Sequence, residues 1–218
     1  QIGNQIPVNG SYHVWEAYAE TVVPLLRDSA LGKSLDINGA YRRTDYSISG
    51  VVETWKVGFS YQPVEDLRIR GTRSRDIRAP NLGELFQTGG SAFTNVFDPV
   101  LNQTVQVREL LQGNPNLKPE KADTWTVGAV YQPSWAPGLS LSLDYYDIKV
   151  NGVIGTISSN LTTQRCFAGL TQFCQAVVFN PNGSIAYTLL QNFNLNALKT
   201  SGLDFELSYE TRVGDGRL

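Results

Sequence analysis

The chain has 218 residues, a formal net charge of −2 and only 17% charged residues. This charge gives no general attraction for nucleic acid, because binding to a phosphate backbone requires many Lys and Arg side chains. No stretch is long and apolar enough for a transmembrane helix, and no basic-then-apolar leader indicates a signal peptide. The sequence lacks Met, even at position 1, so we expect a processed or excised piece of a longer protein.

Apolar and polar residues alternate along seven segments, which predicts β-strands because successive strand side chains point to opposite faces. In chain order the strands are expected at about 11–23, 34–45, 51–62, 67–76, 122–132, 139–150 and 197–210. Soluble strands commonly have about 5–6 residues, whereas a tilted strand needs about 9–11 to cross a bilayer. The length of the predicted strands therefore favours a membrane barrel over a soluble sandwich.

The clearest alternation occurs twice. Residues 53–63 read ETWKVGFSYQP and residues 123–133 read DTWTVGAVYQP, with seven of eleven positions identical. Each copy carries an acidic residue at its start and a Tyr before its closing turn. We expect Tyr61, Tyr131 and Tyr209 in an aromatic girdle near short turns, and Glu53 and Asp123 at the opposite rim of the barrel.

The connections between the predicted strands differ in length. Those at 24–33, 63–66, 133–138 and 211–217 are short and rich in turn residues, and residues 213–218 predict a hairpin turn that enters a further strand. The connections at 77–121 and 151–196 each exceed forty residues, and in an up-and-down meander they fall at the same end as the short 46–50. Outer-membrane barrels have short periplasmic turns and long extracellular loops, so we expect the long connections outside the cell.

Cys166 and Cys174 are the two cysteines of the chain, and His13 is its one histidine. A zinc site would lack ligands, so no metal or other cofactor is predicted. A local disulfide in an oxidising compartment is the favoured interpretation, with two free thiols as the alternative.

Several short segments of the sequence are distinctive when they are taken together in chain order. They are RDIRAPNLGELF at 75–86, GNPNLKPE at 113–120 before DTWTVG at 123–128, VWEAYAE at 14–20, VPLL at 23–26, LSLSLDYYDI at 139–148 and TSGLDF at 200–205. Together they resemble the C-terminal barrel region of TonB-dependent outer-membrane receptors over nearly the whole chain.

This resemblance implies a 22-stranded barrel that is closed by an N-terminal plug and coupled to the inner-membrane TonB complex. The expected fold is all-β: an antiparallel up-and-down transmembrane β-barrel, of which this chain supplies about seven to eight strands. Residues 1–218 would lie within the barrel domain, and the plug, the TonB box and the terminal strands would lie outside this sequence. No residue pattern indicates an enzyme.

Strand phase alone selects the candidate ligand-binding residues of the lumen, which are Arg42, Lys56, Arg70, Asp144 and Glu206. Charged side chains line most wet lumens, so Arg68 and Arg70 are expected to pair with carboxylates on the plug or on neighbouring strands. Arg73 has the outward phase and must lie near the rim, where Arg73 or Arg75 could contact a lipid A phosphate.

The long loops contain Phe86, Phe93, Phe97, Phe167, Phe173 and Phe179. These rings could stack on a ligand, or each loop could build its own small apolar cluster.

The predicted function is TonB-coupled uptake of a scarce ligand, such as a siderophore-iron complex, vitamin B12, a metal or an oligosaccharide. Its partners would be this ligand at the extracellular loops, the TonB complex through the missing N-terminal region, and the lipid and lipopolysaccharide of the outer membrane. The alternatives are a passive porin-type barrel and a secreted β-sandwich adhesin.

Overall fold

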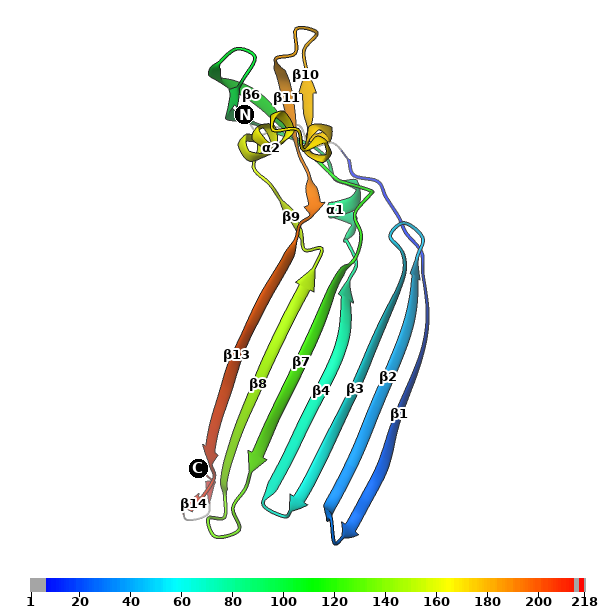
Figure 1. The fold of residues 1–218 in the computed structure, drawn as a ribbon, viewed down its shortest axis with the longest axis vertical. Coiled ribbons are helices and arrows are strands. Elements are labelled where there is room, and N and C mark those ends of the chain that lie inside the picture. The colour runs from blue at the N-terminus through cyan, green and yellow to red at the C-terminus, as the bar shows by residue number, and fades with distance from the viewer. Residues whose placement is uncertain (1–6, 214–215, 218) are drawn as a thin grey trace.

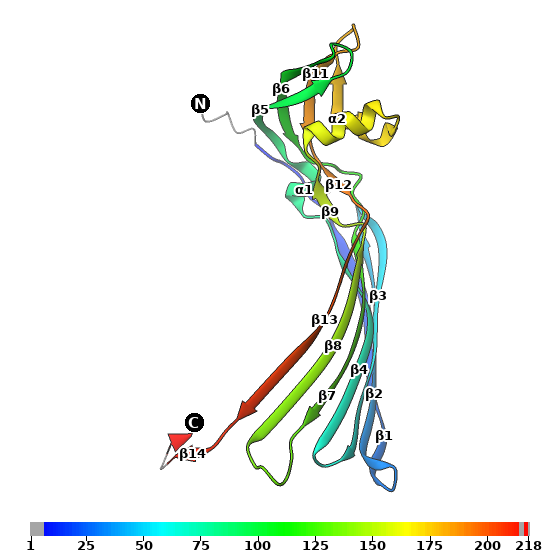
Figure 2. The ribbon, with the colours of Figure 1, turned by 60° about the vertical axis from the view of Figure 1, so that its left-hand side comes forward.

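One curved seven-stranded sheet dominates the computed structural model, which describes residues 7–213 and 216–217 (Figures 1 and 2). Neighbouring strands are antiparallel, and their order across the sheet follows their order in the chain. The strands are β1 (Val14–Ser29), β2 (Gly32–Tyr46), β3 (Gly50–Val64), β4 (Leu67–Arg78), β7 (Glu120–Tyr131), β8 (Leu139–Asn151) and β13 (Ala197–Tyr209). All seven predicted strands are therefore confirmed, and the chain forms part of the wall of an up-and-down barrel.

The predicted end of the first strand at residue 23 is wrong, because β1 continues to Ser29 and turns at residues 30–31. Proline lacks the N–H group that a sheet uses, which made Pro24 resemble a strand end. The structure accommodates Pro24 at a register shift between Pro24 and Leu26. The strand can therefore continue beyond the proline.

Two hydrogen-bonded turns meet at the end of the sheet that carries the short connections, which we call the turn end. Asp66, between β3 and β4, accepts hydrogen bonds from the Ser134 backbone N–H, at 2.9 Å, and from the Ser134 hydroxyl. The Asp66 carbonyl also accepts from the backbone N–H of Gln132 at 2.8 Å. The bonds from the Ser134 hydroxyl and backbone N–H hold the pKa of the Asp66 carboxyl below its usual range. Both turns are thus fixed relative to each other.

The two long connections lie together at the opposite end, which we call the loop end (Figure 1). They contain α1 (Leu82–Phe86), β5 (Thr88–Asp98), β6 (Gln103–Gln112), β9 (Ile154–Thr156), α2 (Ser159–Phe167), the 3-10 helix η1 (Thr171–Ala176), β10 (Val177–Phe179), β11 (Ile185–Leu190) and β12 (Asn192–Asn194). A second sheet has the order β10-β11-β6-β5, in which β11 and β6 are parallel, and β12 pairs with β9. No helix in the described part of the chain is long and apolar enough to cross a membrane.

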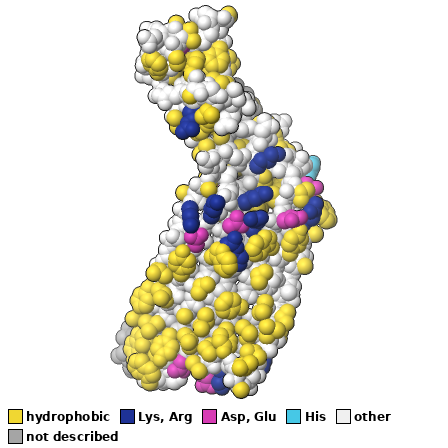
Figure 3. Space-filling model, in the orientation of Figure 1, with side chains coloured by type: hydrophobic (Ala, Val, Ile, Leu, Met, Phe, Trp, Pro, Cys, Tyr) yellow, Lys and Arg dark blue, Asp and Glu magenta, His cyan; other side chains and the backbone are white. Residues whose placement is uncertain are grey.

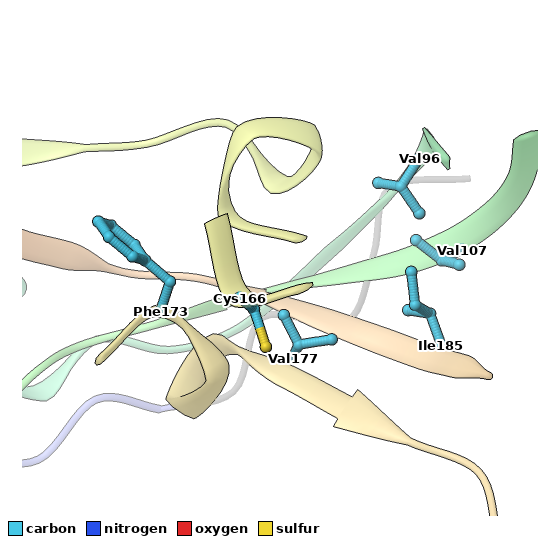
Figure 4. Packing of buried hydrophobic residues seen from close by; sticks show 6 residues of the cluster. All are labelled: Val96, Val107, Cys166, Phe173, Val177 and Ile185. Atoms are coloured by element: carbon cyan, nitrogen blue, oxygen red, sulfur yellow. The ribbon is translucent and has the colours of Figure 1, made fainter. Parts of the chain in front are cut away.

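Both long connections contribute to one hydrophobic core at the loop end. Its buried members are Val96, Val107, Cys166, Phe173, Val177 and Ile185. Figure 4 shows Val107 of β6 beside Ile185 of β11, although the two residues belong to different connections. The expectation that each loop builds its own cluster is therefore wrong, because pairing of β6 with β11 brings the two apolar faces together.

Asp98 adds a polar tie between the same two connections. Its side chain is fully buried. One carboxylate oxygen accepts from the backbone N–H groups of Val100 and Leu101, and the other accepts from the N–H of Ile185 at 2.8 Å. Such bonds offset the cost of burying a carboxylate.

The segments 75–86 and 113–120 pack against each other where the loops leave the sheet. Arg78 donates two hydrogen bonds to Glu120, at 2.8 and 2.9 Å, and also bonds Glu84 at 3.1 Å. Leu85, Leu117 and Ile154 form a second buried cluster beside this pair of contacts. The first connection is therefore anchored directly to the end of β4 and the start of β7.

Two short strands follow the main sheet near the C-terminus. β14 (Arg212–Val213) pairs antiparallel with β15 (Gly216–Arg217). This pairing agrees with the hairpin predicted at 213–218. The residues at the predicted turn, 214–215, lie outside the described residues, as does 218.

Candidate functional site on the polar face of the sheet

The main sheet has two chemically different faces. One carries exposed large hydrophobic residues such as Phe59, Val127, Leu143 and Phe205, and we call it the apolar face. Figure 3 shows hydrophobic side chains over its lower part and a belt of charged side chains above them. The other is the polar face, on which the alternate residues of the same strands lie. Because strand side chains alternate, the two faces follow directly from the phase that the sequence showed.

A groove on the polar face lies near the loop end, across β1, β2, β3 and β4. Its volume is about 380 Å³. The lining includes the predicted residues Arg42 and Lys56, and it adds three acidic side chains, Glu16, Glu20 and Asp76. The structure therefore brings two of the five predicted lumen residues into one site, and both are cations.

Hydrogen bonds and stacking hold part of this groove in place. Glu16 accepts a 2.9 Å bond from the Thr44 hydroxyl and lies 3.8 Å from an Arg42 nitrogen. The Arg42 guanidinium lies 5.3 Å from the centre of the Tyr18 ring. Lys56, in contrast, makes no ion pair with any residue that the structure describes. The site can thus offer one ammonium group, a stacked cation and an aromatic ring to a polar ligand.

Arg70 and Asp144 form an ion pair nearer the turn end of the same face. The two residues belong to β4 and β8, which are separated by β7. Two hydrogen bonds of 3.0 and 2.7 Å join them over Gly128. A Cβ atom at position 128 would lie 1.9 Å from an Asp144 oxygen. The absence of a side chain on the intervening strand is what allows this contact.

The remaining charged residues of this face stand apart. Glu206 lies on β13, opposite Ser142 of β8, and among the described residues neither Glu206 nor Arg68 takes part in an ion pair. Arg70 thus pairs with a carboxylate of the same sheet, two strands away, whereas Arg68 forms no ion pair among the described residues. The five residues chosen by phase do share one face, but they do not form one cluster.

Glu16, Tyr18 and Asp76 belong to the groove but were missed from the sequence. All three have the phase of Arg42 once the antiparallel register is known, because Glu16 pairs with Thr44 and Tyr18 with Arg42. The alternation within 11–23 was a usable signal. It could not say which residue of β1 lies opposite Arg42, because the register shift at Pro24 changes the pairing by one residue.

The charged belt on the apolar face contains the residues predicted for the rim. Glu53 bonds Arg43 at 2.8 Å, and Asp123 accepts two bonds from Arg75, at 2.8 and 3.1 Å. Arg73 lies with its guanidinium 4.6 Å from the centre of the Trp125 ring. In the register of the sheet these residues lie towards the loop end from Phe59, Val127 and Tyr131.

The loop aromatics have mixed environments. Phe173 is buried in the shared core, whereas Phe93, Phe97, Phe167 and Phe179 are exposed. A separate pocket of about 530 Å³ includes Phe173, Phe193 and Arg165 in its lining. The Sγ atoms of Cys166 and Cys174 lie 2.02 Å apart beside this core. The loop body therefore offers few rings that are both exposed and gathered at one place.

Comparison with known proteins identifies the barrel. The family model described as TonB dependent receptor-like, beta-barrel, matches residues 3–216. The chain belongs to the TonB-dependent receptor family. This family consists of transporters of the outer membrane, so the secreted sandwich alternative is wrong. The physical reason is that a sandwich needs two sheets packed face to face, whereas the main sheet is a single layer. None of the curated proteins matches the sequence significantly.

Solved structures share the barrel fold with this chain. The siderophore receptor PirA from Acinetobacter baumannii is 21% identical with a TM-score of 0.62, and covers 94% of this chain and 26% of its own. The ferric enterobactin receptor PfeA from Pseudomonas aeruginosa, as a G324V mutant, is 18% identical with a TM-score of 0.67, covering 94% and 25%. PirA from Pseudomonas aeruginosa is also 18% identical, with a TM-score of 0.62 and coverages of 94% and 32%. The chain thus spans between a quarter and a third of the length of these structures.

Proposed function

We propose that this chain forms part of the wall of an outer-membrane receptor that imports a scarce ligand by TonB-coupled transport. The apolar face would meet lipid, the polar face would line the lumen, and the loop end would lie outside the cell. A plug and a TonB box, encoded outside residues 1–218, would close the barrel and bind the TonB complex. The surrounding partners would be outer-membrane lipid and lipopolysaccharide.

The observation that carries this proposal is the groove on the polar face close to the loop end. A ligand that enters between the loops would reach Lys56, Arg42 and Tyr18 before it reached the middle of the lumen. Lys56 has no ion pair among the described residues and can bind an acidic group of a chelate, and the Tyr18 ring can stack on an aromatic one, beside the carboxylates of the same groove. One of the similar structures is a ferric enterobactin receptor of Pseudomonas aeruginosa in complex with enterobactin. Siderophore-iron is therefore the first ligand class to test, before vitamin B12, other metals and oligosaccharides.

Uptake by the receptor that contains this chain tests the proposal. Cells that lack their other siderophore receptors would be supplied with ⁵⁵Fe-enterobactin, labelled vitamin B12 or labelled maltodextrin. We expect uptake of one of these that disappears when tonB is deleted, and a loss of about tenfold or more for Arg42→Glu combined with Lys56→Glu. Lys33→Gln is the matched control, because Lys33 lies at the turn end and pairs with Glu65 there.

Uptake that persists without TonB would instead support the passive porin. Unchanged uptake in the Arg42 and Lys56 variant would remove the groove from the transport path while leaving the receptor assignment intact.

We also propose that Cys166 and Cys174 form a disulfide in the extracellular loops. Their position at the loop end places them in an oxidising compartment if that end is extracellular. Peptide mass spectrometry without reduction should recover the two cysteines in one linked peptide. Alkylation of both thiols in the unreduced receptor would contradict the pairing.

A further inference from the structure

A patch of positive charge lies on the apolar face over β4, β7, β8 and β13. On these four strands the residues of this phase include five cations and two acids. We call the five cations the outer patch: Arg73, Arg75, Lys121, Lys149 and Lys199. The acids are Asp123 and Asp147. Five positive charges less two negative ones leave a local charge of +3 on a chain whose formal net charge is −2.

Register brings the members of the outer patch side by side. Arg75 pairs in register with Asp123 of β7, Asp123 with Lys149 of β8, and Lys149 with Lys199 of β13. Neighbouring strands are about 4.8 Å apart, so the charges form a continuous row. Arg73 lies in the next row towards the turn end, and Lys121 lies in the next row towards the loop end.

Only part of this charge is neutralised within the chain. Arg75 is held by Asp123, and Lys199 lies 3.2 Å from an Asp147 oxygen. Arg73, Lys121 and Lys149 make no ion pair with a residue that the structure describes. Stacking on Trp125 uses the flat face of the Arg73 guanidinium, which leaves its in-plane N–H donors for another acceptor. Three of the five cations of the outer patch thus have no ion-pair partner among the described residues, and the two nearby acids do not balance the patch.

An apolar hollow of about 320 Å³ lies next to Arg73 on the same face. Its lining includes Val57, Phe59, Val127 and Gly71. The ring of Phe59 packs over Gly71 at one side of the hollow, where a Cβ atom on position 71 would come within 2.5 Å of the ring. The apolar face therefore has cations at the loop-end side of the hollow, and the hollow itself can accept a hydrocarbon chain.

The position of the outer patch along the strands fits a membrane boundary. Asp123 and Tyr131 are eight residues apart, a rise of about 26 Å along a strand, and the apolar band of an outer-membrane barrel is about 25 Å tall. The outer patch therefore lies where hydrocarbon gives way to headgroups, at the loop end. This step rests on the proposed function, which places that end outside the cell.

We propose that the outer patch binds the phosphorylated headgroup of one lipopolysaccharide molecule, with an acyl chain of its lipid A in the hollow beside Gly71. Arg73 and Lys149 would donate charge-assisted hydrogen bonds to phosphate oxygens. Lys121 and Lys199 would add to the local positive potential. The charge of the ligand, its several phosphates and its acyl chains together match the +3 surface and the groove.

The complete receptor, purified from outer membranes in mild detergent, tests this site. Native mass spectrometry would count the lipopolysaccharide molecules that each receptor retains. Arg73→Gln combined with Lys149→Gln should reduce retention by about tenfold or more, since each cation near a charged lipid surface contributes appreciably to binding. Arg43→Gln is the matched control, because Arg43 lies on the same face but outside the outer patch and is paired with Glu53.

A second measurement uses the unaltered receptor. Purified lipid A with two phosphates should bind several times more tightly than lipid A from which one phosphate has been removed. Equal retention in the double variant and in the Arg43→Gln control, or equal binding of the two forms of lipid A, would overturn the proposal. Should the double variant fail to assemble, the comparison of the two lipids decides.

Cell fractionation separates this proposal from the proposed function. A receptor that is absent from the outer membrane would contradict the proposed function. A receptor that assembles there and transports its ligand, but does not discriminate the two forms of lipid A, would contradict the lipopolysaccharide site alone.

Discussion

Gly128 lets two charged side chains meet across a whole strand. The Arg70 side chain crosses β7 to reach Asp144 on β8, and the pair lies where β7 has no side chain. Fixing a long Arg side chain costs conformational entropy, and an exposed pair contributes little to stability. The geometry therefore indicates a role in holding three strands in register rather than a large gain in free energy.

Gly128→Ala should destabilise the barrel, because the new methyl group would lie 1.9 Å from an Asp144 oxygen and would displace that side chain. We expect a loss of about 1–3 kcal/mol of unfolding free energy, measured by denaturant unfolding of the complete receptor. Gly39→Ala is a matched control on β2, since its added atom would meet only contacts of 3.9 Å. Equal stability of the two variants would show that Asp144 moves aside at no cost.

The loops are organised at the scale of the element by their attachment to the sheet. Arg78 at the end of β4 binds Glu120 at the start of β7 and also Glu84 of α1, which carries the capping box with Asn81. Gly113 approaches Leu85 so closely that a Cβ atom would lie 2.6 Å from the Leu85 backbone. The first long connection thus leaves and re-enters the sheet through one rigid base.

Arg78→Ala should loosen this base, because Glu84 and Glu120 are largely buried and would lose their shared cation. Replacing Arg78 should cost about 1–2 kcal/mol after allowance for its own partial exposure. Hydrogen exchange in residues 82–117 should rise, while exchange in β2 and β3 should not change. Arg68→Ala, on the same strand but without an ion pair, provides the control, and equal protection in both variants would refute the role of Arg78.

At the scale of the whole molecule, the sheet is open. Its edge strands β1 and β13 have 16 and 13 residues, and within the part of the chain that the structure describes each has one row of unpaired backbone groups. Closed barrels satisfy such groups by pairing the edges. The apolar face adds exposed hydrophobic side chains from β1, β2, β3, β7, β8 and β13. Both features require the rest of a barrel and a lipid environment.

Residues 1–218 expressed alone should therefore fail to form a folded monomer. We expect aggregation in water and, in detergent, none of the heat-modifiable gel mobility that a closed barrel shows. The complete receptor, treated in the same way, should migrate as a compact species until it is boiled. A soluble monomeric fragment with a cooperative unfolding transition would contradict this expectation.

Alternation with a period of two was enough to predict the seven strands and their two faces, because it is a local property of each segment. The same alternation predicted that one face carries Arg42, Lys56, Arg70, Asp144 and Glu206, because every second residue of a strand points to the same side. The tertiary structure decided which of these residues meet. Arg70 finds Asp144 only because Gly128 lies between them, and Arg42 meets Glu16 only because a bulge at Pro24 sets the register of β1. Tertiary pairing likewise merged two separate loops into one core, since the parallel contact between β6 and β11 joins segments that are distant in the chain and that carry no local signal for each other.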